Sequence, residues 1–276
     1  MKRVAIVSDS AAALPQELAQ ELGIVTVPMH LEIGGRPVSE RDVTPEELVA
    51  HLGDGIQTSG PSPGEFLEAI ESLDSADAVL VLTVGQRYSS TFNAAVAAST
   101  MSDDQKRVRV VDTASAAGGE GLVVLAAAHS AAMGDDIEDV IGRAEYVAGR
   151  VRLVAAVRDL KYLVKGGRLP ASAASLGSQF GVQVLFELRA SGPRPLRPSI
   201  NHASDRLLGL WRRSKKSDDA RLHIAALHSM APDEAAQLLR AVKREIEPVT
   251  AFVGTFGPVM IAHTGPGVIG LSWWWE

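Results

Sequence analysis

The sequence predicts an α/β fold with two domains: an N-terminal α/β domain built on a parallel sheet, and a C-terminal α+β domain. Short runs rich in β-branched residues alternate with longer helical patterns through the first half of the chain, as in a parallel sheet with crossover helices. These runs are almost continuously apolar, as strands covered on both faces must be. The pattern changes near residue 152, and 276 residues at roughly 150 per domain suit two domains. We therefore expect domains at 1–151 and 152–276.

The N-terminal domain is expected to alternate strands and helices along the chain. Its predicted strands are residues 4–7, 25–27, 78–84 and 108–112. Its predicted helices are residues 15–22, 45–52, 64–73, 92–100, 117–133 and 137–150. Because a longer segment separates each strand from the next, the strands are expected to lie parallel.

The second domain has a different pattern, which begins with a predicted strand at 152–157. A strand at 181–188 is expected to form a hairpin through a turn at Gly192-Pro193. The remaining predicted helices are 204–213 and 232–246, and the remaining predicted strands are 222–228, 249–253, 259–262 and 268–272. A hairpin followed by mixed strands and helices predicts an α+β domain.

Composition excludes several classes of function. The net charge of −6 and pI near 5.7 argue against nucleic-acid binding, because a phosphate backbone is bound mainly by clustered Lys and Arg. The chain has no cysteine, which excludes disulfides, thiolate metal sites and a cysteine nucleophile. Its histidines lack the carboxylate spacing of a ligand set, so no metal is expected.

Membrane insertion and export are not expected either. The first apolar run is too short for the apolar segment of a signal peptide. The most apolar later segment, 121–133, is interrupted by His129 and is far shorter than the ~20 residues of a membrane span. We therefore expect a cytoplasmic protein without a transmembrane segment.

Small polar residues cluster near the ends of the predicted strands. The clusters are Ser8-Asp9-Ser10, Thr58-Ser59, Ser89-Ser90-Thr91, Asp112-Thr113 and His263-Thr264-Gly265. In an open parallel sheet, ligands bind beyond the carboxyl ends of the strands, where loops and helix N-termini converge. Hydroxyls, backbone N–H groups and a helix dipole suit an anion. Each cluster alone is typical of a helix cap, but together they indicate one polar pocket.

Nucleotide and hydrolase motifs are missing. Residues 265–270 match G-x-G-x-x-G, but too little sequence follows for a crossover helix and a ribose-binding acid. The chain has neither a P-loop lysine in its glycine-rich frame nor a G-x-S-x-G nucleophile elbow. The sequence therefore predicts no nucleotide site of its own.

Taken in order with residues 160–168, the polar clusters resemble the DegV family over essentially the whole chain. The resemblance implies a bacterial protein that binds a long-chain fatty acid as its ligand, without a cofactor. The tail would lie in the C-terminal domain and the carboxylate in the interdomain cleft. The implied partners are a separate ATP-using fatty acid kinase subunit, which phosphorylates the carboxylate, and a downstream acyltransferase of phospholipid synthesis, with transient contact to a membrane surface.

The resemblance also assigns residues to the site. The carboxylate contacts would be Thr58, Ser89 and His263, and Arg168 would be the basic residue near the cleft mouth. The supporting residues would be Ser59, Ser90, Thr91, Thr264 and Gly265.

Three positions depart from the family pattern. Gly60 and Ser90 stand where the family usually has Gln and Gly, and Gln183 stands where a Lys is expected. These changes leave the hydroxyls that would bind the carboxylate in place. They bear instead on the surface that would dock the kinase and on which lipid is bound. Trp273-Trp274-Trp275 could pack in the core, line the acyl tunnel or face a partner, and packing is the role that we expect because Trp supplies much buried area.

Two other functions remain open at this stage. One is a hydrolase or acyltransferase with Ser89 as nucleophile and His263 as base, although the sequence offers no third group to orient the histidine. The other is a regulatory module that binds another small molecule. For residues 58–66, we expect the Pro and Gly residues to fix a loop that turns Thr58 toward the cleft, supported by the helix from Gly64.

Overall fold

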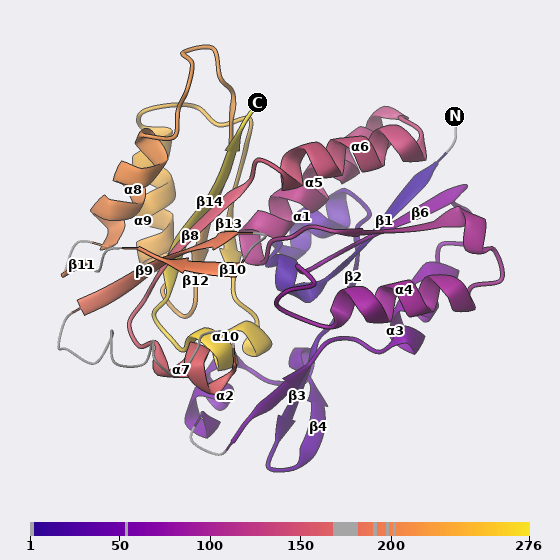
Figure 1. Ribbon diagram of the computed structural model, residues 1–276, viewed down its shortest axis with the longest axis horizontal. Helices are drawn as coiled ribbons and strands as arrows, with labels where there is room; N and C mark the ends of the chain where they lie inside the picture. Colours follow the sequence, from indigo (N-terminus) through magenta and orange to yellow (C-terminus); the bar gives the residue numbers. More distant parts are fainter. Residues whose placement is uncertain (1–2, 53–54, 168–181, 190–191, 197–198, 201–202) are drawn as a thin grey trace.

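The computed structural model describes residues 3–52, 55–167, 182–189, 192–196, 199–200 and 203–276. Two sheets lie side by side with helix α5 (Ala117–Met133) between them, and a small third sheet lies at one end (Figure 1). The observed α/β architecture confirms the predicted fold class. Within the described part of the chain, no helix is both long enough and apolar enough to cross a membrane.

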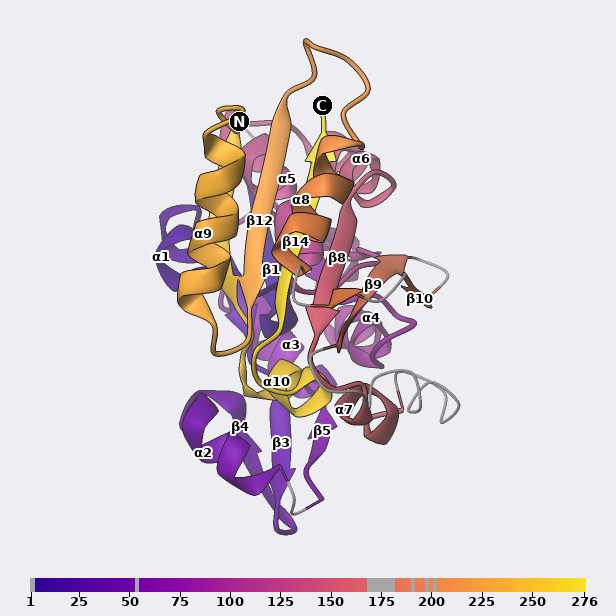
Figure 2. The ribbon, with the colours of Figure 1, turned by 90° about the vertical axis from the view of Figure 1, so that its left-hand side faces the viewer.

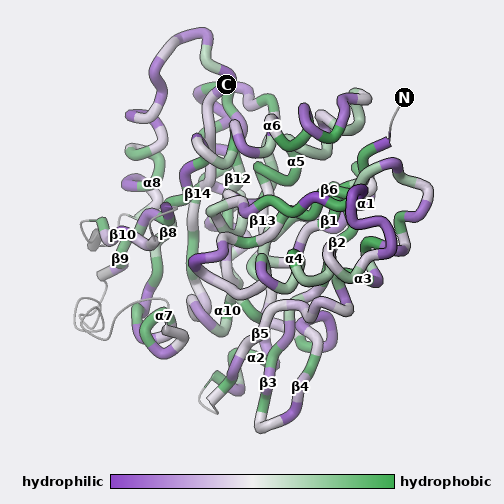
Figure 3. The backbone as a smooth tube through the Cα atoms, turned by 45° about the vertical axis from the view of Figure 1, so that its right-hand side comes forward, coloured by the Kyte–Doolittle hydropathy of each residue, from purple (hydrophilic) through white to green (hydrophobic). Residues whose placement is uncertain are grey.

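The first sheet is fully parallel, with the strand order β2-β1-β6-β7. Side chains of β6 alternate between its faces: Val79 and Val81 pack with α3 and α4, while Leu80 packs with α5 and α6. Strands β1 and β6 and the neighbouring helix α5 carry mostly hydrophobic residues (Figure 3). The elements are β1 (Val4–Asp9), α1 (Gln16–Glu21), β2 (Val25–Val27), α3 (Pro63–Glu71), β6 (Ala78–Thr83), α4 (Thr91–Met101), β7 (Val108–Asp112) and α6 (Ile137–Ala148).

The second sheet is mixed, with the order β10-β9-β8-β14-β12-β13 and a short β11 paired to β9. Only β12 and β13 pair in parallel among the described strands of this sheet. Helices α8 and α9 cover one face (Figure 2) and α5 packs on the other. The elements are β8 (Arg152–Val157), β9 (Val182–Arg189), β10 (Gly192–Pro195), β11 (Ser199–Ile200), α8 (Ala203–Arg212), β12 (Leu222–His228), α9 (Pro232–Lys243), β13 (Thr250–Thr255) and β14 (Ile269–Trp275).

The third sheet was missed by the sequence analysis. It is antiparallel, with the order β4-β3-β5, and helices α2, α7 and α10 lie near it (Figures 1 and 2). These elements are β3 (His30–Ile33), β4 (Arg36–Ser39), α2 (Pro45–His51), β5 (Gln57–Ser59), α7 (Lys161–Lys165) and α10 (Pro258–Thr264). Three short 3-10 helices are η1 (Ser10–Ala12), η2 (Glu40–Asp42) and η3 (Gln105–Arg107).

Two local predictions were wrong. Residues 259–262 were expected to form a strand but lie in helix α10, where Pro258 occupies the first turn and no N–H is needed from it. The hairpin of β9 and β10 is present, but Gly192 pairs with Arg189 and Pro193 with Leu188. The Gly-Pro pair therefore lies in the second strand and does not form the turn.

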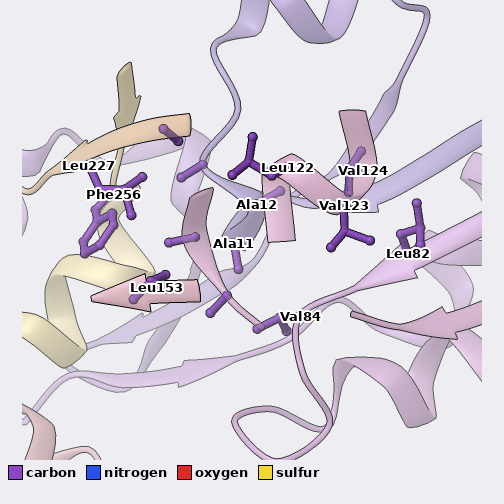
Figure 4. Close-up of a cluster of buried hydrophobic side chains, with 14 of the residues drawn as sticks. Ala11, Ala12, Leu82, Val84, Leu122, Val123, Val124, Leu153, Leu227 and Phe256 are labelled. Carbon is purple, nitrogen blue, oxygen red and sulfur yellow. The ribbon is translucent and has the colours of Figure 1, made fainter. Parts of the chain in front are cut away.

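Helix α5 belongs to both halves of the molecule. A Cβ on Gly118 would lie 2.7 Å from Leu227 Cδ2 on the second sheet, and a Cβ on Gly121 would lie 2.6 Å from the carbonyl oxygen of Ala12. Glycine thus permits close approach on two sides of the helix. The largest buried cluster accordingly joins residues of both sheets (Figure 4). The domain limits 1–151 and 152–276 stay a prediction, since the core is continuous across them.

The three tryptophans of β14 pack in the core, as expected. Trp273 and Trp274 are almost fully buried and join different hydrophobic clusters. The indole N–H groups of Trp273 and Trp275 donate to Ser214 Oγ at 2.7 and 2.9 Å. Successive side chains of a strand point to opposite faces of its sheet. Trp274 therefore packs on one face of the second sheet, and Trp273 and Trp275 pack on the other.

Candidate anion-binding cavity

A cavity of about 450 Å³ lies where the three sheets meet. This volume is in the range of small-molecule sites. Its polar or glycine lining residues are Thr58, Ser59, Gly60, Gln86, Arg87, Tyr88, Ser89, Ser90, His263 and Thr264. Its apolar lining residues are Ala11, Met29, Val84, Ala116, Ala117, Leu153, Ala155, Leu163, Phe186, Leu188, Pro193, Phe256, Val259 and Met260. More of the apolar residues come from after residue 152 than from before it.

Thr58 and His263 meet across the cavity wall. Thr58 lies on β5, and its Oγ1 is 2.8 Å from Nε2 of His263, in the last turn of α10. Both side chains are half-buried. The hydroxyl can donate or accept in this hydrogen bond, depending on the tautomer of the ring. The structure therefore brings two of the predicted carboxylate ligands together from positions 205 residues apart.

Ser89 occupies the loop before helix α4 and is held by the start of that helix. Its Oγ is 2.7 Å from Thr91 Oγ1 and accepts a hydrogen bond from the Thr91 N–H at 3.3 Å. Thr91 is fully buried and does not line the cavity, whereas Ser90 does. Thr91 therefore orients Ser89 without facing the cavity.

The lack of a side chain at Gly60 lets the segment 58–66 pass close to the start of helix α4. A Cβ at Gly60 would lie 2.3 Å from Thr91 Oγ1 and 3.4 Å from its Cα, so a side chain would push the loop away from α4. Next along the chain, Ser62 and Glu65 form a capping box with Pro63 in the first turn of α3. The loop is fixed at both ends, and it places Thr58 and Ser59 at the cavity, as the sequence analysis predicts.

The other predicted residues have different positions. Thr264 lines the cavity, but its hydroxyl donates to the Met260 carbonyl at 2.8 Å. Gly265 is not among the lining residues; its φ is +76° and a Cβ there would lie 2.4 Å from the Tyr162 ring, so its role is in backbone geometry. Gln183 lies on β9 away from the cavity lining. Arg168 lies outside the described residues.

Two acidic residues are buried next to the cavity. Asp9 accepts hydrogen bonds from the N–H groups of Ala11 at 2.9 Å and Val84 at 2.8 Å, and both of these residues line the cavity. Burial raises the pKa of Asp9 to about 6. Burial and the neighbouring Asp9 raise the pKa of Glu120 well above its usual value. The cluster Ser8-Asp9-Ser10 thus includes a carboxyl that supports the wall and does not face the ligand space.

The sequence analysis missed three consecutive polar lining residues, Gln86, Arg87 and Tyr88. The Tyr88 hydroxyl donates to the Arg189 carbonyl at 2.5 Å, which joins the loop after β6 to the end of β9. Burial raises the pKa of Tyr88 to about 12, so the hydroxyl stays protonated. Residues 86–88 come directly before the predicted cluster Ser89-Ser90-Thr91, and this position in the sequence was the signal that could have identified them.

Comparison with known proteins agrees with this architecture. The profile of the DegV family, described as uncharacterised proteins, matches residues 3–276. A DegV domain-containing protein of Streptomyces coelicolor is 32% identical over 277 residues, with 98% of each chain covered. A fatty-acid-binding DegV family protein of Thermus thermophilus is 29% identical, with a TM-score of 0.88 and 99% of each chain covered. A DegV lipid-binding protein of Thermotoga maritima is 26% identical, with a TM-score of 0.86 and coverage of 100% of this chain and 99% of that one. On both sequence and fold, this chain belongs to the DegV family.

Proposed function

We propose that this protein binds a long-chain fatty acid in the cavity, with the carboxylate held by Thr58, Ser89 and His263. The observation that carries the proposal is a single cavity that joins this cluster of hydroxyl and imidazole groups to an extensive apolar wall. Ser59, Ser90 and Thr264 line the same space and support the headgroup site. The relatives from Thermus thermophilus and Thermotoga maritima, which bind fatty acid and lipid, add weight to it.

The energetics favour a lipid over a short polar anion. Each buried methylene contributes about 0.8 kcal/mol before ordering costs, so a sixteen-carbon tail supplies most of the affinity. Hydrogen bonds to the charged carboxylate add about 1.5–3 kcal/mol each. The cluster therefore orients the ligand, while the apolar wall retains it.

The hydrogen bonds at the site support binding more than nucleophilic catalysis. Ser89 Oγ is bonded to Thr91 Oγ1, and His263 Nε2 is bonded to Thr58 Oγ1. A serine nucleophile needs its base within hydrogen-bond reach and a further group that orients the base. These pairs support an anion site: if His263 Nε2–H donates to Thr58, the Thr58 hydroxyl can donate to a carboxylate, as can the hydroxyl of Ser89.

The cellular role that we propose is that of a carrier. A separate ATP-dependent kinase subunit would phosphorylate the bound carboxylate, and a downstream acyltransferase would consume the acyl phosphate. The sequence contains no P-loop frame for ATP, which supports a division of labour between two proteins. Arg168, beside Gly166 and Gly167, is the residue that we propose assists the meeting of phosphate and carboxylate.

Native mass spectrometry of protein purified from cells tests the binding function directly. We expect the intact mass to exceed the chain mass by that of a long-chain fatty acid, which is released on denaturation. Protein that carries no lipid, and that takes up no fatty acid on titration after solvent extraction, would refute the proposal.

A paired assay tests the carrier role. Lipid-loaded protein with ATP should yield acyl phosphate only when a fatty acid kinase subunit is added. Hydrolysis of acyl esters by the protein alone, lost in Ser89→Ala, would favour the enzyme function instead. Kinase-dependent product that is unchanged in Arg168→Ala would keep the carrier role and remove the role of Arg168.

A further inference from the structure

Arg87 stands out among the residues that line the cavity. Among the described lining residues it is the only Asp, Glu, Lys or Arg side chain. Tyr88 is held in its protonated form by its raised pKa, and the other lining groups near it are hydroxyls, an amide and apolar side chains. The permanent charge at this part of the cavity is therefore positive.

The position of Arg87 is fixed by the hairpin of β9 and β10. A Cβ at Gly192 would lie 2.6 Å from Arg87 Nε and 3.3 Å from Cζ, so the guanidinium rests directly on this glycine. Gly192 has a φ of +112°, a conformation that other residues rarely adopt. The adjacent hydrogen bond from Tyr88 to the Arg189 carbonyl anchors the same loop to the same hairpin. Both contacts come from this one hairpin, and together they hold Arg87 beside the cavity.

The charge of Arg87 is also available. Several arginines of the described chain are neutralised by carboxylates, as Arg152 and Arg189 are by Glu187. No carboxylate within the described residues forms an ion pair with Arg87. Asp112 lies behind the loop, but its Oδ1 accepts from the N–H groups of Gln86 and Ala114. An exposed guanidinium two residues before Ser89 is thus placed to attract an anion that enters the cavity.

We propose that Arg87 determines the specificity of the cavity for anionic headgroups, so that a free fatty acid is preferred over a neutral lipid of the same chain length. This inference rests on the proposed function, because it assumes that the ligand is a lipid whose headgroup lies near Ser89. The guanidinium acts through charge and through its planar set of donors, which match a carboxylate. An uncharged ester has the same tail and gains nothing from the cation.

Delipidated wild type, Arg87→Gln and Arg87→Lys should be titrated with palmitate and with methyl palmitate by displacement of a fluorescent fatty acid. Because Arg87 is exposed, we expect Arg87→Gln to weaken palmitate binding by only about three- to tenfold and to leave methyl palmitate binding unchanged. Arg87→Lys should retain most of the preference. Raising NaCl from about 0.05 to 0.5 M should weaken palmitate binding in wild type but not in Arg87→Gln.

Arg194→Gln is the matched control, since it removes the same charge from an exposed position on β10 outside the cavity. An equal loss of affinity for palmitate and the ester in Arg87→Gln would mean that Arg87 only packs, and an unchanged affinity for both would mean that it plays no part. Either result overturns the inference while lipid binding stands.

Wild-type protein that binds neither lipid would instead refute the proposed function itself. If Arg87→Gln does not fold, Arg87→Lys provides the test, because it keeps the positive charge. An Arg87→Lys variant that binds the ester normally but no longer prefers palmitate would contradict a role of charge.

Discussion

Two polar clusters near the carboxyl ends of the first-sheet strands have opposite surroundings. Asp9 and Glu120 are fully buried, do not line the cavity, and have raised pKa values. Thr58, Ser89 and His263 are half-buried and line the cavity. Asp9 accepts from two backbone N–H groups and so supports the wall, with Glu120 buried beside it. The hydroxyls and the imidazole of the other cluster leave the negative charge to be supplied by a ligand. The comparison separates residues that shape the cavity from residues that face it.

The largest effect is expected from the wall. Asp9→Ala should lower the free energy of unfolding by about 2–5 kcal/mol, because it leaves the buried N–H groups of Ala11 and Val84 without an acceptor. Chemical denaturation measures the change. Asp42→Ala, which removes an exposed carboxylate at the end of η2, should alter stability by less than about 0.5 kcal/mol. Equal stability of the two variants would show that Asp9 does not support the wall.

The cavity-facing cluster should affect binding and not stability. Thr58→Ala, Ser89→Ala and His263→Ala should each weaken fatty acid binding by roughly 10- to 150-fold, which corresponds to the loss of one hydrogen bond to a charged group. Titration of delipidated protein gives the affinity, and a thermal scan shows whether the fold is retained. Full-strength binding in all three variants would remove the carboxylate assignment.

The buried pair should also make stability depend on pH. The folded state retains the Glu120 proton above the usual pKa of 4.5 while the unfolded state loses it, so the free energy of unfolding falls as pH rises from there. The slope from this group is at most about 1.4 kcal/mol per pH unit. Glu120→Gln should lack this decline, so its stability relative to wild type should increase from pH 4.5 to 6.5 in denaturation curves. Parallel pH profiles of the two proteins would argue against a retained proton.

The smallest effect concerns the hydrogen bond that joins the loop after β6 to the end of β9 beside the cavity. Tyr88→Phe keeps the ring but removes the hydrogen bond to the Arg189 carbonyl, which contributes about 0.5–1.5 kcal/mol. We expect release of a fluorescent fatty acid to become about two- to tenfold faster, with thermal stability nearly unchanged. Stopped-flow displacement measures the release rate. A rate equal to that of wild type would place the exit path elsewhere.

The sequence predicted the regular core well. The bounds of β7, α5 and β8 agree with the expected segments 108–112, 117–133 and 152–157, because continuous apolar runs of different length distinguish a buried strand from a buried helix. The small third sheet was not predictable in this way. Leu31 is buried within β3, the other residues of β3 and β4 are partly buried or exposed, and β4 contains Pro37, so no apolar run marks these strands. They form a local hairpin across Gly34 and Gly35, whereas β5 joins β3 from further along the chain.

The site was predictable in its parts but not in its assembly. The resemblance predicted Thr58, Ser89 and His263, and all three line the cavity. Residues 259–262, directly before His263, were expected to form a strand but lie in helix α10. The imidazole of His263 lies in the last turn of this helix, within hydrogen-bond distance of Thr58. Arg87 was missed because an isolated arginine has no pattern of its own, and its importance comes from the cavity that it lines.

The central place of β14 has a consequence for biosynthesis. This strand lies between β8 and β12 in the second sheet, yet it leaves the ribosome after both of them. Until it arrives, the edges of β8 and β12 have unpaired N–H and C=O groups, which can pair with other chains. The pairs β8-β9 and β12-β13 can form earlier, but the two parts of the second sheet are joined only once β14 has been synthesised.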